Sequence, residues 1–143
     1  MRFPYMSEKI KITFLGTSGA IPTAKRNHTG IFLNYKNENI LVDCGEGIQR
    51  QFKLAKISPL KLDKLLITHW HGDHVLGIPG LLQTLSFNNY RKTLDIYGAK
   101  GIKNHISNVL KAFPSVKNVV ADVKIRTKEI STLILNVCIY NVK

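Results

Sequence analysis

Four side chains that commonly bind metal ions lie within six positions, in the segment Thr68-His69-Trp70-His71-Gly72-Asp73-His74. Three of the five histidines of the chain are in this segment, beside an aspartate. Histidines two positions apart in an extended segment point to the same side, so His69 and His71 can bind one ion. Asp73 and His74 follow the glycine and can face a second ion. The spacing therefore favours two neighbouring metal sites over a surface loop whose histidines have no function.

The sequence on both sides of this segment predicts a loop between a strand and a helix. The apolar run Leu65-Leu66-Ile67 comes before it, and an apolar-periodic run over 75–82 follows it. The ends of strands in open α/β sheets are where ligands usually bind. The sequence therefore places the four side chains where a metal site is expected.

The rest of the chain predicts alternating strands and helices without an internal repeat or a linker. Pro79 is compatible with the helix after the loop only near its start. Strands are expected over 10–15, 30–35, 39–43, 62–68 and 94–98, with β-rich segments over 119–126 and 130–140. Helices are expected over 48–55, from Asp73 or His74 to about Phe87, and over 101–113.

Several polar residues allow two interpretations. Asp43 and Glu46 can orient the metal ligands from behind, or they can cap the helix that follows them. Arg26 can hold a phosphate, although a solvated loop residue is the favoured interpretation. His105 has no acidic or histidine neighbour at ligand spacing and is expected on a helix surface. The metal-binding prediction therefore rests on the loop alone.

The composition indicates one globular domain with a basic surface. The 143 residues include 21 lysines and arginines against nine acidic residues, a formal net charge of +12. This surplus favours a polyanionic partner, because neutralising phosphates releases counterions. The alternative explanation of the charge is a proteome that uses lysine heavily in all its proteins. No lysine or arginine lies between Lys64 and Arg91, so basic residues flank the metal loop on both sides.

Neither a disulfide framework nor a membrane segment is predicted. Cys44 and Cys138 are the only cysteines, and we expect buried, reduced thiols. No apolar run reaches the roughly 18 residues of a membrane span, and residues 1–6 lack the apolar core of a signal peptide. We therefore expect a cytoplasmic protein.

Motifs along the chain resemble those of ribonuclease Z, the tRNA 3′-processing endonucleases of the metallo-β-lactamase superfamily. The His-x-His-x-Asp-His spacing alone defines only the superfamily, and the strings around it narrow the choice. The resemblance covers about positions 10 to 115. The matching strings are Phe14-Leu15-Gly16-Thr17, residues 22–27, Leu41-Val42-Asp43-Cys44-Gly45-Glu46, residues 67–74, Gly77-Ile78-Pro79-Gly80-Leu81-Leu82 and Tyr97-Gly98-Ala99-Lys100-Gly101.

The resemblance implies an α+β fold, a metallo-β-lactamase-like αββα sandwich of which this chain covers roughly the first half. His69 and His71 would bind one zinc ion, and Asp73 and His74 the other. Asp73 would also be the catalytic proton acceptor. The substrate would be precursor tRNA, and the enzyme would be a homodimer.

The chain departs from that family in its ligand set. The complete site also needs a further histidine, an aspartate and a last histidine, but no histidine follows His105. Zinc normally has three or four protein ligands. We therefore expect residues 1–143 to be the N-terminal part of a single domain, with one apolar sheet face uncovered and little activity alone.

Two other functions remain open from the sequence. One is another hydrolase of the superfamily, acting on a small phosphodiester, a lactam or a thioester. The other is an inactive fragment that binds RNA or a protein partner through its basic surface. The basic balance and the Gly-Ile-Pro-Gly-Leu-Leu string favour the ribonuclease.

Overall fold

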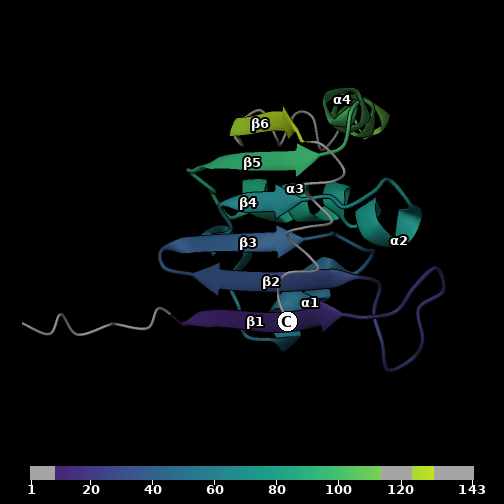
Figure 1. Cartoon of the computed structure of the whole chain (residues 1–143), viewed down its shortest axis with the longest axis vertical. Helices are drawn as coiled ribbons and strands as arrows, with labels where there is room; N and C mark the ends of the chain where they lie inside the picture. The colour runs from purple at the N-terminus through teal and green to yellow at the C-terminus, as the bar shows by residue number, and fades with distance from the viewer. Residues whose placement is uncertain (1–8, 114–123, 131–143) are drawn as a thin grey trace, which may run out of the picture.

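A computed structural model describes residues 9–113 and 124–130 of the chain. They contain one six-stranded mixed sheet with the strands in sequence order (Figure 1). The sheet explains why the candidate metal-binding segment lies at an edge, because three parallel strands end beside it. The strands are β1 (Ile10–Gly16), β2 (Gly30–Tyr35), β3 (Glu38–Val42), β4 (Lys64–Leu66), β5 (Thr93–Gly98) and β6 (Lys124–Glu129).

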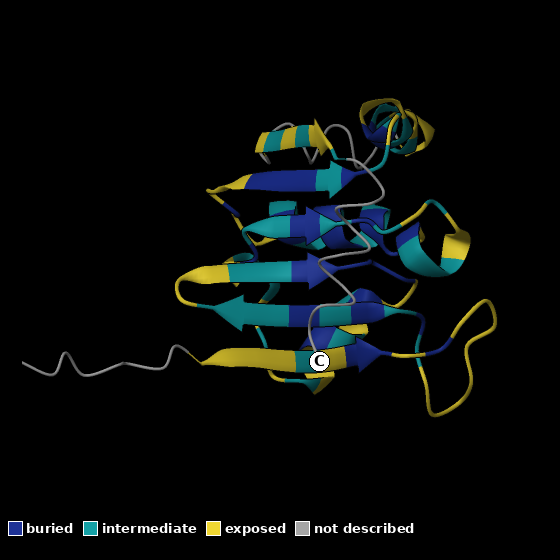
Figure 2. Cartoon of the chain, in the orientation of Figure 1, coloured by how far each residue is buried: buried dark blue, intermediate teal, exposed yellow. Residues whose placement is uncertain are grey.

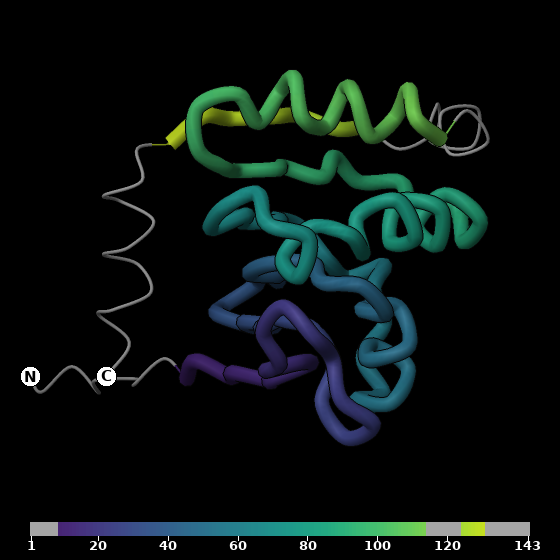
Figure 3. Tube along the Cα trace, turned by 90° about the vertical axis from the view of Figure 1, so that its right-hand side faces the viewer, coloured from purple at the N-terminus to yellow at the C-terminus, as the bar shows by residue number. Residues whose placement is uncertain are grey.

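The direction of the strands changes at β3. β1, β2 and β3 form an antiparallel meander, whereas β3, β4, β5 and β6 are parallel to one another. Because parallel strands end at the same edge, the segments after β3, β4 and β5 come together there (Figures 1 and 3). This edge carries the predicted metal ligands.

The helices connect the parallel strands, as β-α-β crossovers require. α1 and α3 lie together on one face of the sheet, and α2 lies at the edge where β4 ends (Figure 1). α4 packs beside β6. Their bounds are α1 (Ile48–Leu54), α2 (Gly72–Val75), α3 (Ile78–Phe87) and α4 (Ile102–Ala112), with a short 3-10 helix η1 at Pro59–Lys61.

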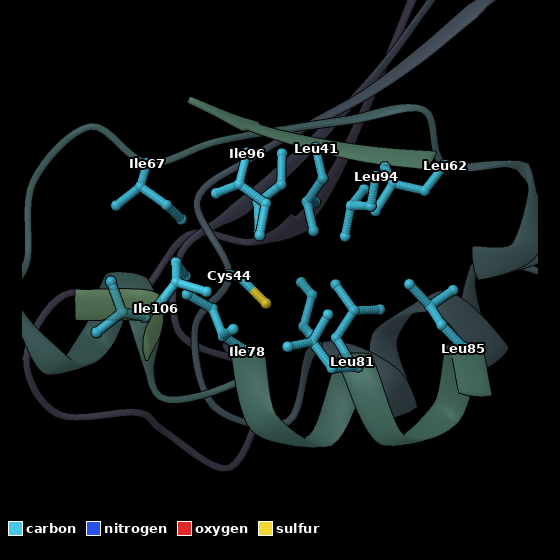
Figure 4. Close-up of a cluster of buried hydrophobic side chains, with 14 of the residues drawn as sticks. Leu41, Cys44, Leu62, Ile67, Ile78, Leu81, Leu85, Leu94, Ile96 and Ile106 are labelled. Atoms are coloured by element: carbon cyan, nitrogen blue, oxygen red, sulfur yellow. The ribbon is translucent and has the colours of Figure 1, made fainter. Parts of the chain in front are cut away.

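The core fills the space between the sheet and its helices (Figure 4). Leu65 on β4, Ile96 on β5 and Leu81 on α3 are fully buried members of this one core cluster. Phe32 and Phe52 meet edge to face, with ring centroids 5.6 Å apart. This packing fixes the positions of β4 and α3, and hence of the loop between them.

The opposite face of β1 presents large apolar side chains to solvent. Ile10, Ile12 and Phe14 are 56, 39 and 66% exposed (Figure 2). They alternate along β1 with Lys11 and Thr13, as a strand requires. Soluble monomers rarely expose such patches. The sequence prediction of an apolar face agrees with these exposures.

The structure corrects two predicted elements. β4 is shorter than the strand expected over 62–68. Of the β-rich segment expected over 119–126, residues 119–123 lie outside the described residues, and the rest belongs to β6. The helix expected from Asp73 or His74 to Phe87 is two helices. The Gly77 N–H donates to the Cys44 carbonyl at 2.9 Å, and a new helix begins at Ile78 with Pro79 in its first turn. The predicted strand over 130–140 lies almost entirely outside the described residues.

The other strands and helices agree with their predicted positions to within one or two residues. Cys44 is a buried free thiol, as expected, whereas Cys138 lies outside the described residues. None of the described helices has the length and apolar character needed to span a bilayer.

Candidate metal centre

The two histidines of the His-x-His motif lie in the segment between β4 and α2. The buried Ile67 is held by a hydrogen bond from its N–H to the Tyr97 carbonyl of β5, at 2.8 Å. His71 has extended backbone angles, φ −89° and ψ 153°, and α2 begins at the next residue. The rings of His69 and His71 lie beside each other, with centroids 4.6 Å apart, as the spacing predicts.

The imidazoles of the loop converge. Nε2 of His69 lies 3.1 Å from Nδ1 of His71, and the ring of His74 lies 4.1 Å from that of His69, centroid to centroid. Two nitrogens that bind one tetrahedral zinc ion at about 2.0–2.1 Å lie about 3.3 Å apart. The spacing of His69 and His71 therefore fits a shared zinc ion closely.

Asp73 and His74 form the second pair. Oδ2 of Asp73 lies 3.3 Å from Nε2 of His74, and both side chains are mostly buried. Within residues 9–113 and 124–130, no group of three or more His, Cys, Asp or Glu side chains is arranged to hold one metal ion. Each pair thus offers two donors of a type that zinc binds, fewer than the three or four of a complete zinc site.

Asp43, at the end of β3, holds the loop from behind. Its Oδ2 lies 2.7 Å from Nδ1 of His74, and its Oδ1 accepts a hydrogen bond from the Thr68 N–H at 2.8 Å. If Nδ1 of His74 donates to this carboxylate, Nε2 keeps its lone pair for a metal. Asp43 has a left-handed backbone, φ 59°, which aspartate tolerates better than most residues.

The contacts decide between the two interpretations of Asp43 and Glu46. The N-cap residue of α1 is Gly47, and no side chain caps this helix. Asp43 therefore orients His74 and Thr68 rather than capping α1. Glu46 is exposed, and its backbone carbonyl accepts a hydrogen bond from the Asn27 amide.

The surroundings of His69 favour its neutral imidazole. Loss of hydration lowers the pKa of His69, and the nearby rings of His74 and His71 lower it further. A metal binds the neutral form, so a lowered pKa favours binding at neutral pH. Burial, with a smaller contribution from Asp43, raises the pKa of the Cys44 thiol, which keeps this thiol protonated.

Sequence reasoning gave no role to Thr68. Its hydroxyl lies 2.9 Å from Oδ2 of Asp43 and 3.0 Å from Nδ1 of His69. A hydroxyl that donates to the carboxylate can accept from Nδ1 of His69, which leaves Nε2 of that ring to face a metal. The only sequence feature that could have indicated this role is the position of the threonine directly before the His-x-His motif.

His105 lies on α4 and is partly exposed, in agreement with the predicted position on a helix surface. The sequence did not predict its contact with Trp70, on which its ring stacks with centroids 4.5 Å apart and planes 17° from parallel. The contact forms because adjacent parallel strands bring the loop after β4 next to the start of α4. Arg26 is exposed in the loop between β1 and β2, where its backbone N–H donates to the Thr23 hydroxyl.

The chain is similar to known proteins in sequence and in fold. Residues 10–124 match the family model described as Anti-Pycsar protein Apyc1. A protein of Methanothermobacter thermautotrophicus named ribonuclease Z is 55% identical over 93 residues, which are 65% of this chain and 30% of that protein. The chain thus spans about a third of the length of this relative.

Solved structures give the fold. The structure of human tRNase Z, short form, superposes with a TM-score of 0.72 and 34% identity, over 82% of this chain and 44% of the human chain. The metallo-β-lactamase fold protein YhfI of Bacillus subtilis superposes with a TM-score of 0.62 and 23% identity, over 85% and 47% of the two chains. The predicted fold class is confirmed, with the described residues forming part of that fold. The chain therefore belongs to the family described by the Anti-Pycsar protein Apyc1 model, and its sequence matches a part of ribonuclease Z, as its motifs predict.

Proposed function

We propose that the chain supplies half of the metal site of a zinc-dependent endoribonuclease that removes the 3′ trailer from precursor tRNA. His69 and His71 would hold one zinc ion, and Asp73 and His74 the other. The observation that carries the proposal is the convergence of three imidazoles and a carboxylate at the end of β4, with Asp43 behind His74 at 2.7 Å.

The substrate class is supported by the relatives and by the charge. The protein named ribonuclease Z shares about half of the matched residues with this chain, and the human tRNase Z shares about a third. The net charge of +12 suits a nucleic acid. The absence of lysine and arginine between Lys64 and Arg91 leaves the donors free of adjacent positive charge in the sequence.

The chemistry divides between the ions and the protein. Two zinc ions would activate a water molecule and stabilise the charges of both the entering and the leaving oxygen of a phosphodiester. Asp73 would accept the proton from the attacking water. Asp43 and Thr68 would hold His74 and His69 in the tautomers that present Nε2.

The donor count limits what this chain does alone. Each pair offers two protein ligands, whereas zinc normally takes three or four. We therefore propose that the remaining ligands come from residues beyond those described, and that the 143 residues alone bind zinc weakly and turn over little or no substrate. The same proposal includes a cytoplasmic location and a homodimer. Light scattering can test the homodimer.

A chimaera tests the assignment. The chain would be joined to the unmatched remainder of the Methanothermobacter thermautotrophicus relative and given a precursor tRNA with a 3′ trailer. We expect zinc-dependent cleavage and its loss in Asp73→Ala, because both a ligand and the proton acceptor are removed. Asp63→Asn is the matched control, since Asp63 lies beside Asn39 and Lys92 at the other end of the sheet.

Three results would contradict the proposal. The first is an Asp73→Ala chimaera that cleaves as fast as the parent. The second is activity on a thioester or on a small chromogenic phosphodiester without activity on the tRNA. The third is robust cleavage by the 143 residues without the added segment, which would contradict the half-site.

A further inference from the structure

A cavity of about 240 Å³ opens beside the metal loop. Thr68, His69 and Trp70 line it from the segment after β4, and Ala99, Lys100 and His105 line it from the segment after β5. It therefore shares His69 with the candidate metal centre. A substrate group held in this cavity would lie next to the metal.

One wall of the cavity is an aromatic stack. The rings of Trp70 and His105 are parallel to within 17°, with centroids 4.5 Å apart. The pair differs from Phe32 and Phe52, which are buried in the core and meet edge to face. Trp70 and His105 are only half-buried, so this stack remains accessible from the cavity. Accessible flat rings are what proteins use to stack nucleobases.

The same cavity has a cation at its rim. Lys100 is exposed, and no ion pair of its ammonium group is seen with any residue in the described ranges. A lysine next to an aromatic wall suits a phosphate attached to a stacked base. The apolar side chains of Ile67 and Ile102 complete the lining and suit a base rather than a sugar.

We infer that this cavity binds one nucleotide of an RNA strand, with its base against Trp70 and His105 and its phosphate at Lys100. The RNA source rests on the proposed function, but the site itself rests on the stack, the cation and the cavity. His105 and Lys100 are then residues that position the substrate beside the metal centre. Their contribution is to binding and does not require zinc.

The single tryptophan of the chain allows a direct test. Because Trp70 lines the cavity, its fluorescence reports occupancy in the 143-residue chain with a chelator present. A short oligoribonucleotide should quench it saturably, and ribose 5-phosphate should not at the same concentration. His105→Ala should weaken binding about 5- to 150-fold, the usual range for loss of one stacked base, whereas His105→Phe should bind within a few-fold of the parent.

The phosphate contact has its own test. Lys100→Gln should reduce the slope of log affinity against log salt by about 0.7, the value for one phosphate of a single strand. Lys103→Gln is the matched control, because Lys103 is an exposed lysine of α4 that does not line the cavity. It should leave the slope unchanged.

Three outcomes would overturn the inference. The first is equal quenching by ribose 5-phosphate and by the oligoribonucleotide. The second is unchanged affinity in a folded His105→Ala chain. The third is a salt slope that falls as much in Lys103→Gln as in Lys100→Gln. A mononucleotide that binds as tightly as the oligoribonucleotide would overturn the assignment to RNA. None of these measurements involves cleavage or zinc, so their failure is distinguishable from failure of the nuclease proposal.

Discussion

Asp43, directly after β3, and His74, in α2, are joined by a 2.7 Å contact between Oδ2 and Nδ1. The same carboxylate binds the N–H and the hydroxyl of Thr68. One residue at the end of β3 therefore positions both ends of the metal loop. A carboxylate behind a histidine ligand fixes its tautomer and raises its basicity.

Asp43→Asn should weaken zinc binding by about 10- to 100-fold, the usual effect of removing such a partner. Asparagine also tolerates the left-handed backbone at this position, so the loop should keep its path. Competition with a zinc-binding dye measures the affinity.

Asp63→Asn serves as the control, because this carboxylate hydrogen-bonds Asn39 at the opposite end of the sheet. Equal zinc affinities for the Asp43→Asn variant and the parent would show that Asp43 does not support the site.

Gly77→Ala should lower the free energy of unfolding by about 1–3 kcal/mol or more, because overpacking at a backbone contact forces the chain to move. A Cβ at Gly77 would lie 2.1 Å from the Gly45 carbonyl oxygen and 2.9 Å from that of Cys44. Urea unfolding followed by circular dichroism measures the change.

The matched control is Gly19→Ala, where a Cβ meets nothing within 4 Å. If both variants unfold at the same urea concentration, the close approach of Gly77 to the segment after β3 is not as described.

The break between α2 and α3 at Gly77 could not be predicted from the sequence. The apolar pattern on both sides predicts one helix, because periodicity reports local structure. The interruption comes from the Cys44 carbonyl, which is distant in the sequence and accepts the Gly77 N–H. The loop, the flanking strands and the order of elements were predictable because they depend on local patterns.

Acid should weaken the attachment of β6 to β5. Arg126 donates hydrogen bonds to the Asp95 carboxylate, one of them from Nη2 to Oδ2 at 2.7 Å. These hydrogen bonds lower the pKa of Asp95, and the positive charge of Arg126 lowers it further. The stabilisation is complete above the ordinary aspartate pKa of about 3.9 and is lost as the pH falls through the lowered pKa of the folded state. The unfolding free energy of Arg126→Gln should therefore decrease less than that of the parent as the pH falls.

The effect should be modest, because the Arg126 side chain is 60% exposed. Lys124→Gln removes a charge from the same strand, opposite Thr93 rather than Asp95, and should keep the parent pH profile. A profile for Arg126→Gln that matches the parent would mean that this ion pair does not contribute.

Cys44 should resist alkylation in the folded chain. The thiol is fully buried, and its raised pKa removes the reactive thiolate at neutral pH. In a Cys138→Ser background, mass spectrometry should find Cys44 modified by iodoacetamide only after urea is added. Rapid modification without urea would contradict the burial.

The site was predictable to the extent that it lies in one segment. The four residues lie within six positions, and extended backbone at His71 followed by the turn of α2 brings them together: His69, His71, Asp73 and His74. The role of Asp43 remained one of two alternatives, since the choice depends on which loop lies behind the histidines. The contact between Trp70 and His105 was missed because it exists only through the pairing of β4 with β5.

The central claim is that the loop after β4 binds zinc through its own side chains. X-ray absorption at the zinc edge, on the chain loaded with one equivalent of zinc, tests it most directly. The account predicts nitrogen and oxygen neighbours at about 2.0–2.1 Å with imidazole scattering, reduced in His69→Gln and His71→Gln. A spectrum with sulfur neighbours, or one that both variants leave unchanged, would contradict it.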